Sequence, residues 1–278
     1  MENRARVLID CSDEKGLVCN ITKVFFDLDL NIDHNREFVD KDNSKFFMRT
    51  VVTGKFNTEE LFKSLKSITP QDAKIKIIEP KRKKIVIMAT RESHCLGDIL
   101  IRWESGELDA DIEAVVANHK DLQSLTHRFN IPFNYISAEN ISREEHEQKV
   151  LLLLKDIDFD YIVLAKYMRI LSNDFVENYR WRIINIHHSF LPAFIGANPY
   201  KQAHSRGVKI IGATAHFVTS NLDEGPIISQ DVIPVNHYYK WRDMQKAGKD
   251  VEKIVLSKAL ALVLNDRVFI HKNKTVVF

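Results

Sequence analysis

The chain has 278 residues, more than one ordinary domain needs, so one large domain or two smaller ones are expected. Its 40 basic and 38 acidic residues leave a formal net charge of +2, which argues against a large binding surface for nucleic acid or for a membrane. Hydrophobic residues make up 45% of the chain, which is enough for a sizeable core.

Strand and helix patterns alternate through the first 80 residues. In chain order they predict a strand, a helix, two strands, a helix and a last strand, over residues 5–11, 12–30, 31–54, 57–69 and 73–79. The two central strands flank the polar turn Asp40–Ser44, and Asn57 is a candidate cap for the second helix. The order βαββαβ is typical of a ferredoxin-like sandwich.

A proline-marked basic run, EPKRKK at residues 79–84, follows this unit and predicts a solvated linker. We therefore expect two domains, residues 1–80 and 81–278. Apolar strand patterns without polar alternation begin at residues 84, 111, 160 and 182, and helical patterns separate them. Alternating strands and helices predict a parallel, doubly wound, Rossmann-like sheet. A further strand pair over residues 208–218 and 226–235 and a long helix over Trp241–Leu264 complete the second domain.

The cysteines and the start of the chain bear on the compartment. Cys11, Cys19 and Cys95 form no CxxC pair and no zinc spacing, so free thiols and a reducing compartment are expected. The first residues, MENRARVLIDCSDEKG, contain acidic side chains and no adequate apolar segment for a signal peptide. No apolar run approaches the roughly 20 residues needed to span a bilayer. We expect a cytoplasmic protein without a metal site.

The stretch RIINIHHSFLPAFIGANPY, residues 182–200, carries the strongest candidate chemistry. It begins as a buried strand, places Asn185 and His187 two residues apart, and then loses regular structure at Pro192, Gly196 and Pro199. Ligands of open α/β sheets collect at the carboxyl ends of parallel strands, and strand alternation puts Asn185 and His187 on one face. The same alternation predicts that His188 points away, as a buried histidine bonded to a backbone carbonyl. A rigid turn beside a site also favours a cis Leu191–Pro192 bond.

A histidine that acts as a base needs a partner to orient its ring. Asp223, in the loop TSNLDEGPI between the two late strands, is the candidate. By itself this loop is more typical of a turn whose Asp and Gly suit turn geometry than of a catalytic loop.

Three motifs in order, LAKYMRIL, NIHHSFLPAF and GATAHFVTSNLDEGPII, resemble the formyltransferase domain that handles 10-formyltetrahydrofolate, over about residues 84–278. The resemblance implies that Asn185, His187 and Asp223 form the catalytic trio. It also implies that the substrate contacts residues of two further segments, namely Met168, Arg169, Ile170, Leu171 and Gly225. No cofactor is expected, because the folate is the substrate.

The loop after the first strand of this domain, TRESHCLGD, contains no glycine before Gly97. A cradle for an acceptor's phosphate, built from backbone N–H groups as in relatives that formylate glycinamide ribonucleotide, is therefore not expected. The N-terminal unit, with DEKGLVCNIT, resembles an ACT regulatory domain, and with SHCLGDIL and NKTVVF the whole chain resembles the formyltetrahydrofolate deformylases. That resemblance implies hydrolysis of 10-formyltetrahydrofolate to formate, for one-carbon metabolism and purine synthesis, and tetrahydrofolate.

Two alternatives stay open at this point. One is a folate-dependent formyltransferase with an amine acceptor, and the other is a non-catalytic regulator that binds folate or an amino acid. The ACT resemblance implies a homo-oligomer formed through residues 5–79. It also implies a small amino-acid effector beside the first helix, near Asp13, Gly16 and Leu17.

Overall fold

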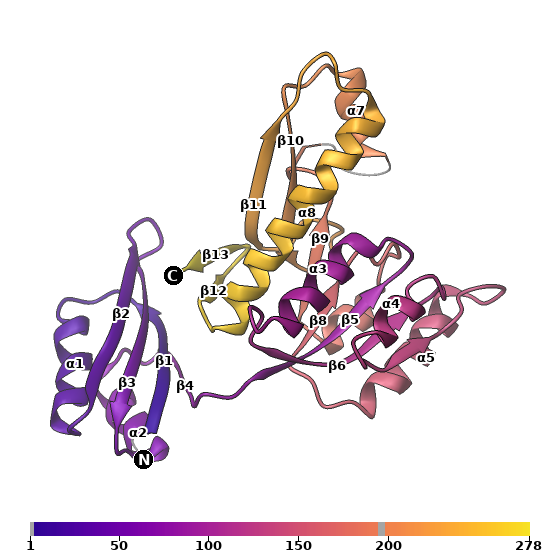
Figure 1. Cartoon of the computed structure of the whole chain (residues 1–278). Helices are drawn as coiled ribbons and strands as arrows, with labels where there is room; N and C mark the ends of the chain where they lie inside the picture. Colours follow the sequence, from indigo (N-terminus) through magenta and orange to yellow (C-terminus); the bar gives the residue numbers. More distant parts are fainter. Residues whose placement is uncertain (1–2, 194–197) are drawn as a thin grey trace. The chain divides into compact units, whose positions relative to one another are not determined.

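The computed structural model describes residues 3–193 and 198–278, and the chain divides into two compact units (Figure 1). The first unit contains the N-terminal residues through Lys81 together with Asp266–His271 and Val276–Phe278. The second contains Arg82–Asn265 and Lys272–Thr275. The unit boundary near residue 81 lies where the sequence predicts a linker, but two C-terminal segments expected in the second domain belong to the first unit.

The first unit has the predicted βαββαβ order. Its elements are β1 Asn3–Ser12, α1 Leu17–Asp27, β2 Asn31–Asp40, β3 Lys45–Gly54, α2 Thr58–Ile68 and β4 Lys74–Ile78. The strands form one sheet in the order β2-β3-β1-β4, and all neighbours are antiparallel. Asn57 caps α2 as predicted, because its side chain accepts the N–H groups of Glu59 and Glu60. One face of β1, including Val7 and Ile9, packs against the two helices.

The other face of this sheet is partly covered by the chain's own C-terminal residues. Leu8 and Phe47 form an apolar cluster with Phe269 and Phe278, which lie close to the end of the chain. Arg6 donates to the Asp266 carboxylate at 2.9 Å. The part of this sheet face that these residues cover is therefore not available for pairing with another copy of the chain.

The second unit is built on a seven-stranded sheet in the order β11-β10-β9-β8-β5-β6-β7. The strands are β5 Lys83–Ala89, β6 Ala110–Ala117, β7 Phe133–Tyr135, β8 Tyr161–Leu164, β9 Ile183–His187, β10 Ile210–Phe217 and β11 Ile227–Pro234. Strands β5 to β9 are parallel, and β10 and β11 add an antiparallel edge. The chain runs from β5 outward through β6 and β7 and then returns to β8 and β9. This reversal of strand order confirms the doubly wound fold.

Helices lie between most of these strands, and a last helix follows β11. They are α3 Ser93–Glu104, α4 Gln123–His127, α5 Arg143–Lys155, α6 Asn173–Asn178, α7 Pro199–Ser205 and α8 Trp241–Leu264. The long helix α8 packs along β10 and β11 and against α3. Ser142 caps α5 through a reciprocal capping box with Glu145. Residues 85–89 of β5 are fully buried, which explains why this strand has no polar alternation.

The elements that the sequence did not predict are short or lie near the end of the chain. They are β7, α6, α7 and a terminal hairpin of β12 Val268–His271 and β13 Lys274–Val277. The Leu191–Pro192 bond is cis, as predicted, and Gly196 lies outside the described residues. All three cysteines are free. Within the described ranges, no helix has the length and apolar character that crossing a bilayer requires.

Candidate active site

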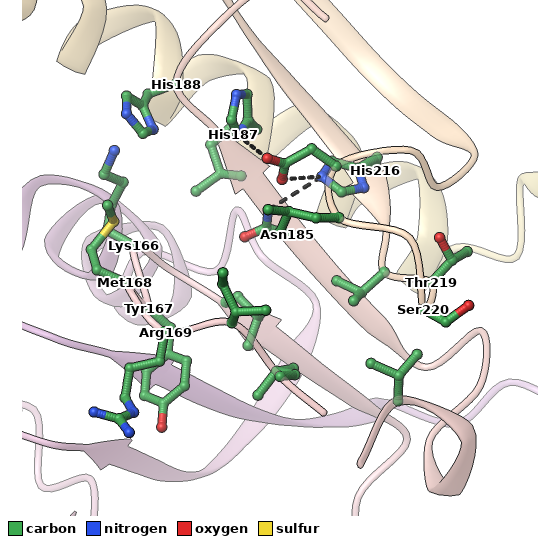
Figure 2. A pocket seen from close by; sticks show the side chains of 18 residues that line it. Lys166, Tyr167, Met168, Arg169, Asn185, His187, His188, His216, Thr219 and Ser220 are labelled. Carbon is green, nitrogen blue, oxygen red and sulfur yellow. Dashed lines mark hydrogen bonds and ion pairs between the residues drawn. The ribbon is translucent and has the colours of Figure 1, made fainter. Parts of the chain in front are cut away.

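The carboxyl ends of β8 and β9 and the loop after β10 line a cavity of about 320 Å³ in the second unit (Figure 2). Asn185 and His187 both reach this cavity from β9. They are two residues apart in a strand that continues through His187, so their shared face is confirmed. Asp223 reaches the same cavity from the loop that joins β10 to β11. The three residues predicted as a catalytic trio therefore lie together.

His187 and Asp223 are in direct contact. The ring Nδ1 of His187 lies 3.3 Å from Oδ2 of Asp223, and both side chains are largely buried. Burial alone would raise the pKa of Asp223, but the hydrogen bond and charge of His187 hold it below its usual value. The other ring nitrogen, Nε2, is buried and has no hydrogen-bond partner among the described residues. With Nδ1–H directed to the carboxylate, Nε2 carries the lone pair and can accept a proton.

His216 is a fourth polar side chain at this position, and the sequence analysis missed it. It lies opposite Asn185 in the antiparallel pair of β10 and β9. Its Nδ1 contacts the carbonyl oxygen of Phe217 at 2.9 Å, which requires Nδ1 to be protonated and makes Nε2 an acceptor. Asn185 Nδ2 lies 3.2 Å from that Nε2, so one amide N–H is donated to His216. The bond fixes the amide orientation of Asn185 and leaves its second N–H available.

Burial lowers the pKa of His216, which keeps this imidazole neutral and suited to accept a hydrogen bond. A histidine inside an apolar strand, GATAHFV, was the signal that could have identified it. Its importance became visible only through the register that pairs it with Asn185.

The loop that carries Asp223 has a backbone conformation that depends on Gly225. A Cβ atom added at Gly225 would lie 1.7 Å from the carbonyl oxygen of Phe217. The Phe217 N–H donates to the Pro226 carbonyl at 2.9 Å, which closes the loop at this point. Gly225 does not line the cavity, so the structure gives no support to a direct substrate contact. It allows the close approach of two backbone segments.

Gly225→Ala is therefore expected to displace the loop and lower turnover at least tenfold, because Asp223 would leave its place beside His187. Gly97→Ala, inside α3, is the matched control, because an added Cβ there meets only Leu125 Cδ2 at 3.9 Å, an ordinary van der Waals distance. Initial rates and thermal unfolding of both variants test the expectation. Unchanged turnover in Gly225→Ala would contradict it.

The segment Met168–Leu171 follows β8 and lines the cavity over its full length. Met168 and Ile170 are more than half exposed, whereas Tyr167 beside them is buried. Large apolar side chains that remain exposed in a cavity are typical of a ligand-binding surface. The Met168 N–H donates to Thr90 Oγ1 at 3.0 Å, which ties this segment to the end of β5. The structure thus places the predicted MRIL segment against the candidate trio.

His188 does not point away from the cavity, so the prediction based on strand alternation is wrong. Strand β9 ends at His187, and the alternation rule does not extend to the next residue. His188 lines the same cavity as His187, and the two ring centroids are 5.2 Å apart. Burial and the nearby charge of Lys166 lower the pKa of His188 to about 4.

A buried ion pair lies beside His188. Lys166 Nζ is 3.1 Å from Glu252 Oε2, and both side chains are almost completely buried. Tyr200 donates its hydroxyl to Glu252 Oε1 at 2.8 Å, and His94 Nε2 lies 2.8 Å from Oε2. Burial alone would raise the pKa of Glu252, but the His94 hydrogen bond and the Lys166 charge lower it to about 2.

His94, Cys95 and Glu252 also bring potential metal-ligand atoms within 4.8 Å of one another, a proximity that their spacing in the sequence did not predict. The Glu252 oxygens are already engaged by Lys166, Tyr200 and His94. Burial raises the pKa of the Cys95 thiol, which disfavours the thiolate that a metal would need. The donor set therefore fits a hydrogen-bonded network better than a metal site.

Glu252→Gln is expected to lower the free energy of unfolding by about 3 kcal/mol or more, because Lys166 would remain charged in a buried place without its partner. The ionisation of Glu252 also makes the stability depend on pH. The pKa of Glu252 lies below its ordinary value of 4.5, so the contribution of the ionised carboxylate to the free energy of unfolding is present above pH 4.5 and is lost as the pH falls toward 2. Urea unfolding at neutral and acidic pH measures both effects. The exposed Glu104→Gln is the control, and an equal stability of the two variants would contradict the argument.

The loop between β5 and α3 contains no glycine and ends in a carboxylate side chain. Glu92 directly precedes α3, and its side chain is paired with Lys249 at 2.9 Å. Its carboxylate makes no capping hydrogen bond to the N–H groups of α3. The expectation that this loop is not a glycine-rich phosphate cradle therefore stays a prediction that rests on its sequence.

Comparisons with known proteins agree with this arrangement. The family model described as "Formyl transferase" matches residues 83–260, and the ACT domain model matches residues 5–69. A formyltetrahydrofolate deformylase of Haemophilus influenzae is 54% identical, and the alignment covers 98% of each chain. The crystal structure of a deformylase from Pseudomonas syringae has a TM-score of 0.95 at 41% identity and covers 100% of this chain and 95% of that one. A glycinamide ribonucleotide transformylase from Symbiobacterium toebii is more distant, with a TM-score of 0.68 at 26% identity over 71% of this chain and 94% of that one.

The fold and the site thus define a protein with an N-terminal ACT domain followed by a formyl transferase domain. Full-length identity above 50% and the close structural match further specify which family of such two-domain proteins the chain belongs to. The chain belongs to the formyltetrahydrofolate deformylase family.

Proposed function

We propose that this protein hydrolyses 10-formyltetrahydrofolate to formate and tetrahydrofolate. The observation that carries the proposal is the contact of His187 with Asp223 beside Asn185, at one end of a cavity lined by Met168–Leu171. Water is a weak nucleophile and the N-formyl group is amide-like, so the reaction needs a base and a stabilised oxyanion. The site offers groups for both tasks.

Asn185 supplies the oxyanion contact in this proposal. One of its N–H groups is held by His216, and the other can donate to the formyl oxygen. The oxygen gains negative charge as the tetrahedral intermediate forms, and one such donor contributes about 3 kcal/mol to the transition state. The amide carries no charge, so it favours the oxyanion without binding an anion in the resting site.

His187 transfers the proton. Its Nε2 takes a proton from water as the water oxygen bonds to the formyl carbon, and Asp223 stabilises the imidazolium through Nδ1. The same proton then passes to the leaving nitrogen N10 as the carbon–nitrogen bond breaks. Tetrahydrofolate and formic acid result, the acid loses its remaining proton to solvent as formate, and the histidine returns to its neutral form. General acid–base catalysis of this kind contributes about 10²–10⁴-fold.

Incubation of the purified chain with 10-formyltetrahydrofolate alone tests the proposal. Stoichiometric formate without any added acceptor is expected. Formyl transfer that starts only when an amine is added would instead support the transferase alternative. Tight folate binding without turnover would indicate a regulator.

We propose further that the ACT unit forms a homo-oligomer and receives a small amino acid. One support is the match to the ACT domain model. The other is Gly16, whose φ of +93° turns the chain into α1 between the exposed Asp13 and the buried Leu17. N–H groups at a helix N-terminus favour a carboxylate. Part of β2, including Phe38, remains exposed for pairing.

Calorimetry of the full chain with a panel of amino acids, paired with turnover and light scattering, tests both parts. Binding that changes turnover or oligomer size supports the effector, because an effector acts only by preferring one state over another. A monomer that binds no amino acid would remove both proposals.

A further inference from the structure

His188 is the side chain at which the main cavity meets a second, smaller one. A chamber of about 190 Å³ lies beside the main cavity, and among the described residues that line them the two share Lys166, Met168 and His188. The chamber is lined by charged and polar groups that include Glu92, Lys249 and Glu252. Figure 2 shows the amino end of Lys166 and the ring of His188 on the same side of the cavity. The mechanism above assigns no task to either residue.

Hydrolysis requires protein groups that position the nucleophile, whereas transfer to a large acceptor does not. A large acceptor brings its own binding groups, which hold its amine near the formyl carbon. A water molecule has none, so side chains of the protein must fix its place and the direction of its lone pair. His187 can accept only one of the two water protons. The second needs another acceptor for the water to be oriented.

We propose that His188 is this second acceptor and so acts as a catalytic residue that selects water as the nucleophile. Hydrogen bonds from water to a ring nitrogen are about 2.8–3.0 Å long. Ring centroids 5.2 Å apart therefore allow one water molecule to contact a nitrogen of each histidine. This inference rests on the proposed hydrolysis.

The buried ion pair gives His188 the properties that this task requires. Lys166 is fixed by Glu252, which in turn is held by Tyr200 and His94. Burial and, after it, the charge of the fixed cation lower the pKa of the neighbouring imidazole and keep it neutral, and a neutral imidazole always retains one accepting nitrogen. His188 is therefore a hydrogen-bond acceptor at neutral pH and a weak base, which leaves the proton transfer itself to His187.

The test compares His188→Ala with the wild-type chain in formate release and in the choice of nucleophile. Turnover of the variant is expected to fall about 100-fold at unchanged folate affinity, because water loses its orientation. Hydroxylamine added as a competing nucleophile should then capture the formyl group, and the ratio of formylhydroxamate to formate should rise at least tenfold. A purely structural role would lower both products together and leave that ratio unchanged.

Three further variants make the result unambiguous. His188→Asn and His188→Gln each offer an amide oxygen near one ring nitrogen, and at least one should recover part of the hydrolysis. His204→Ala, at an exposed histidine of α7, should behave as wild type. Hydrolysis by His188→Ala within threefold of wild type, or an unchanged product ratio, would overturn the inference. Absence of formate with the wild-type chain would instead refute the proposed function itself.

Discussion

Asp223→Asn is expected to lower turnover by roughly 10³–10⁴-fold and to leave folate binding nearly unchanged. The substitution keeps the size of the side chain and removes its charge. An asparagine that turns its NH₂ group toward His187 Nδ1 forces that nitrogen to become the acceptor. The proton then moves to Nε2, which can no longer receive one from water. Loss of the carboxylate also removes the charge that stabilises the imidazolium.

The backbone at this position makes the substitution a clean test. Asp223 has a φ of +57°, in the left-handed region that asparagine tolerates as well as aspartate does. The loop should therefore keep its conformation. Single-turnover formate release and a fluorescence titration with a folate analogue separate chemistry from binding. Asp231→Asn, at a partly exposed carboxylate paired with Lys258, is the control. Near-normal turnover would show that Asp223 is only a turn residue.

Hydrophobic periodicity and the order of strand and helix patterns along the chain were sufficient to predict both folds, because these patterns are local properties of the sequence. Alternation also placed Asn185 and His187 on one face, since both lie inside β9. The same rule gave the wrong direction for His188 because it was applied one residue beyond the strand. A strand end is set by hydrogen bonding with neighbours, here with β10, and this information is not local in the sequence.

The missed features all depend on contacts between distant residues. His216 became relevant through its register opposite Asn185, and Glu252 through its approach to Lys166 across 86 positions. The C-terminal residues that cover the first sheet, Phe269 and Phe278, are more than 200 residues from Leu8 in sequence. Such pairings follow from the packing of whole elements, which single-sequence patterns do not specify.

His187→Asn is expected to lower turnover by roughly 10³-fold, because the site loses the group that takes a proton from water and returns it to N10. Asparagine fits the strand position, and folate affinity should change little, since the apolar contacts of Met168–Leu171 remain. His237→Asn, at an exposed histidine, is the matched control. A variant that kept near-normal turnover would show that another group acts as the base.

The double variant with His187→Asn and Asp223→Asn decides whether the two residues act as a pair. Their contact is 3.3 Å long and buried, so Asp223 influences the reaction chiefly through the ring of His187. Once the ring is absent, removal of the carboxylate should therefore lower turnover little further. The double variant should therefore be about as active as His187→Asn alone, as found for groups that work as one unit. If the two losses instead multiplied, Asp223 would have a separate task, such as holding the attacking water, and the histidine would not depend on it.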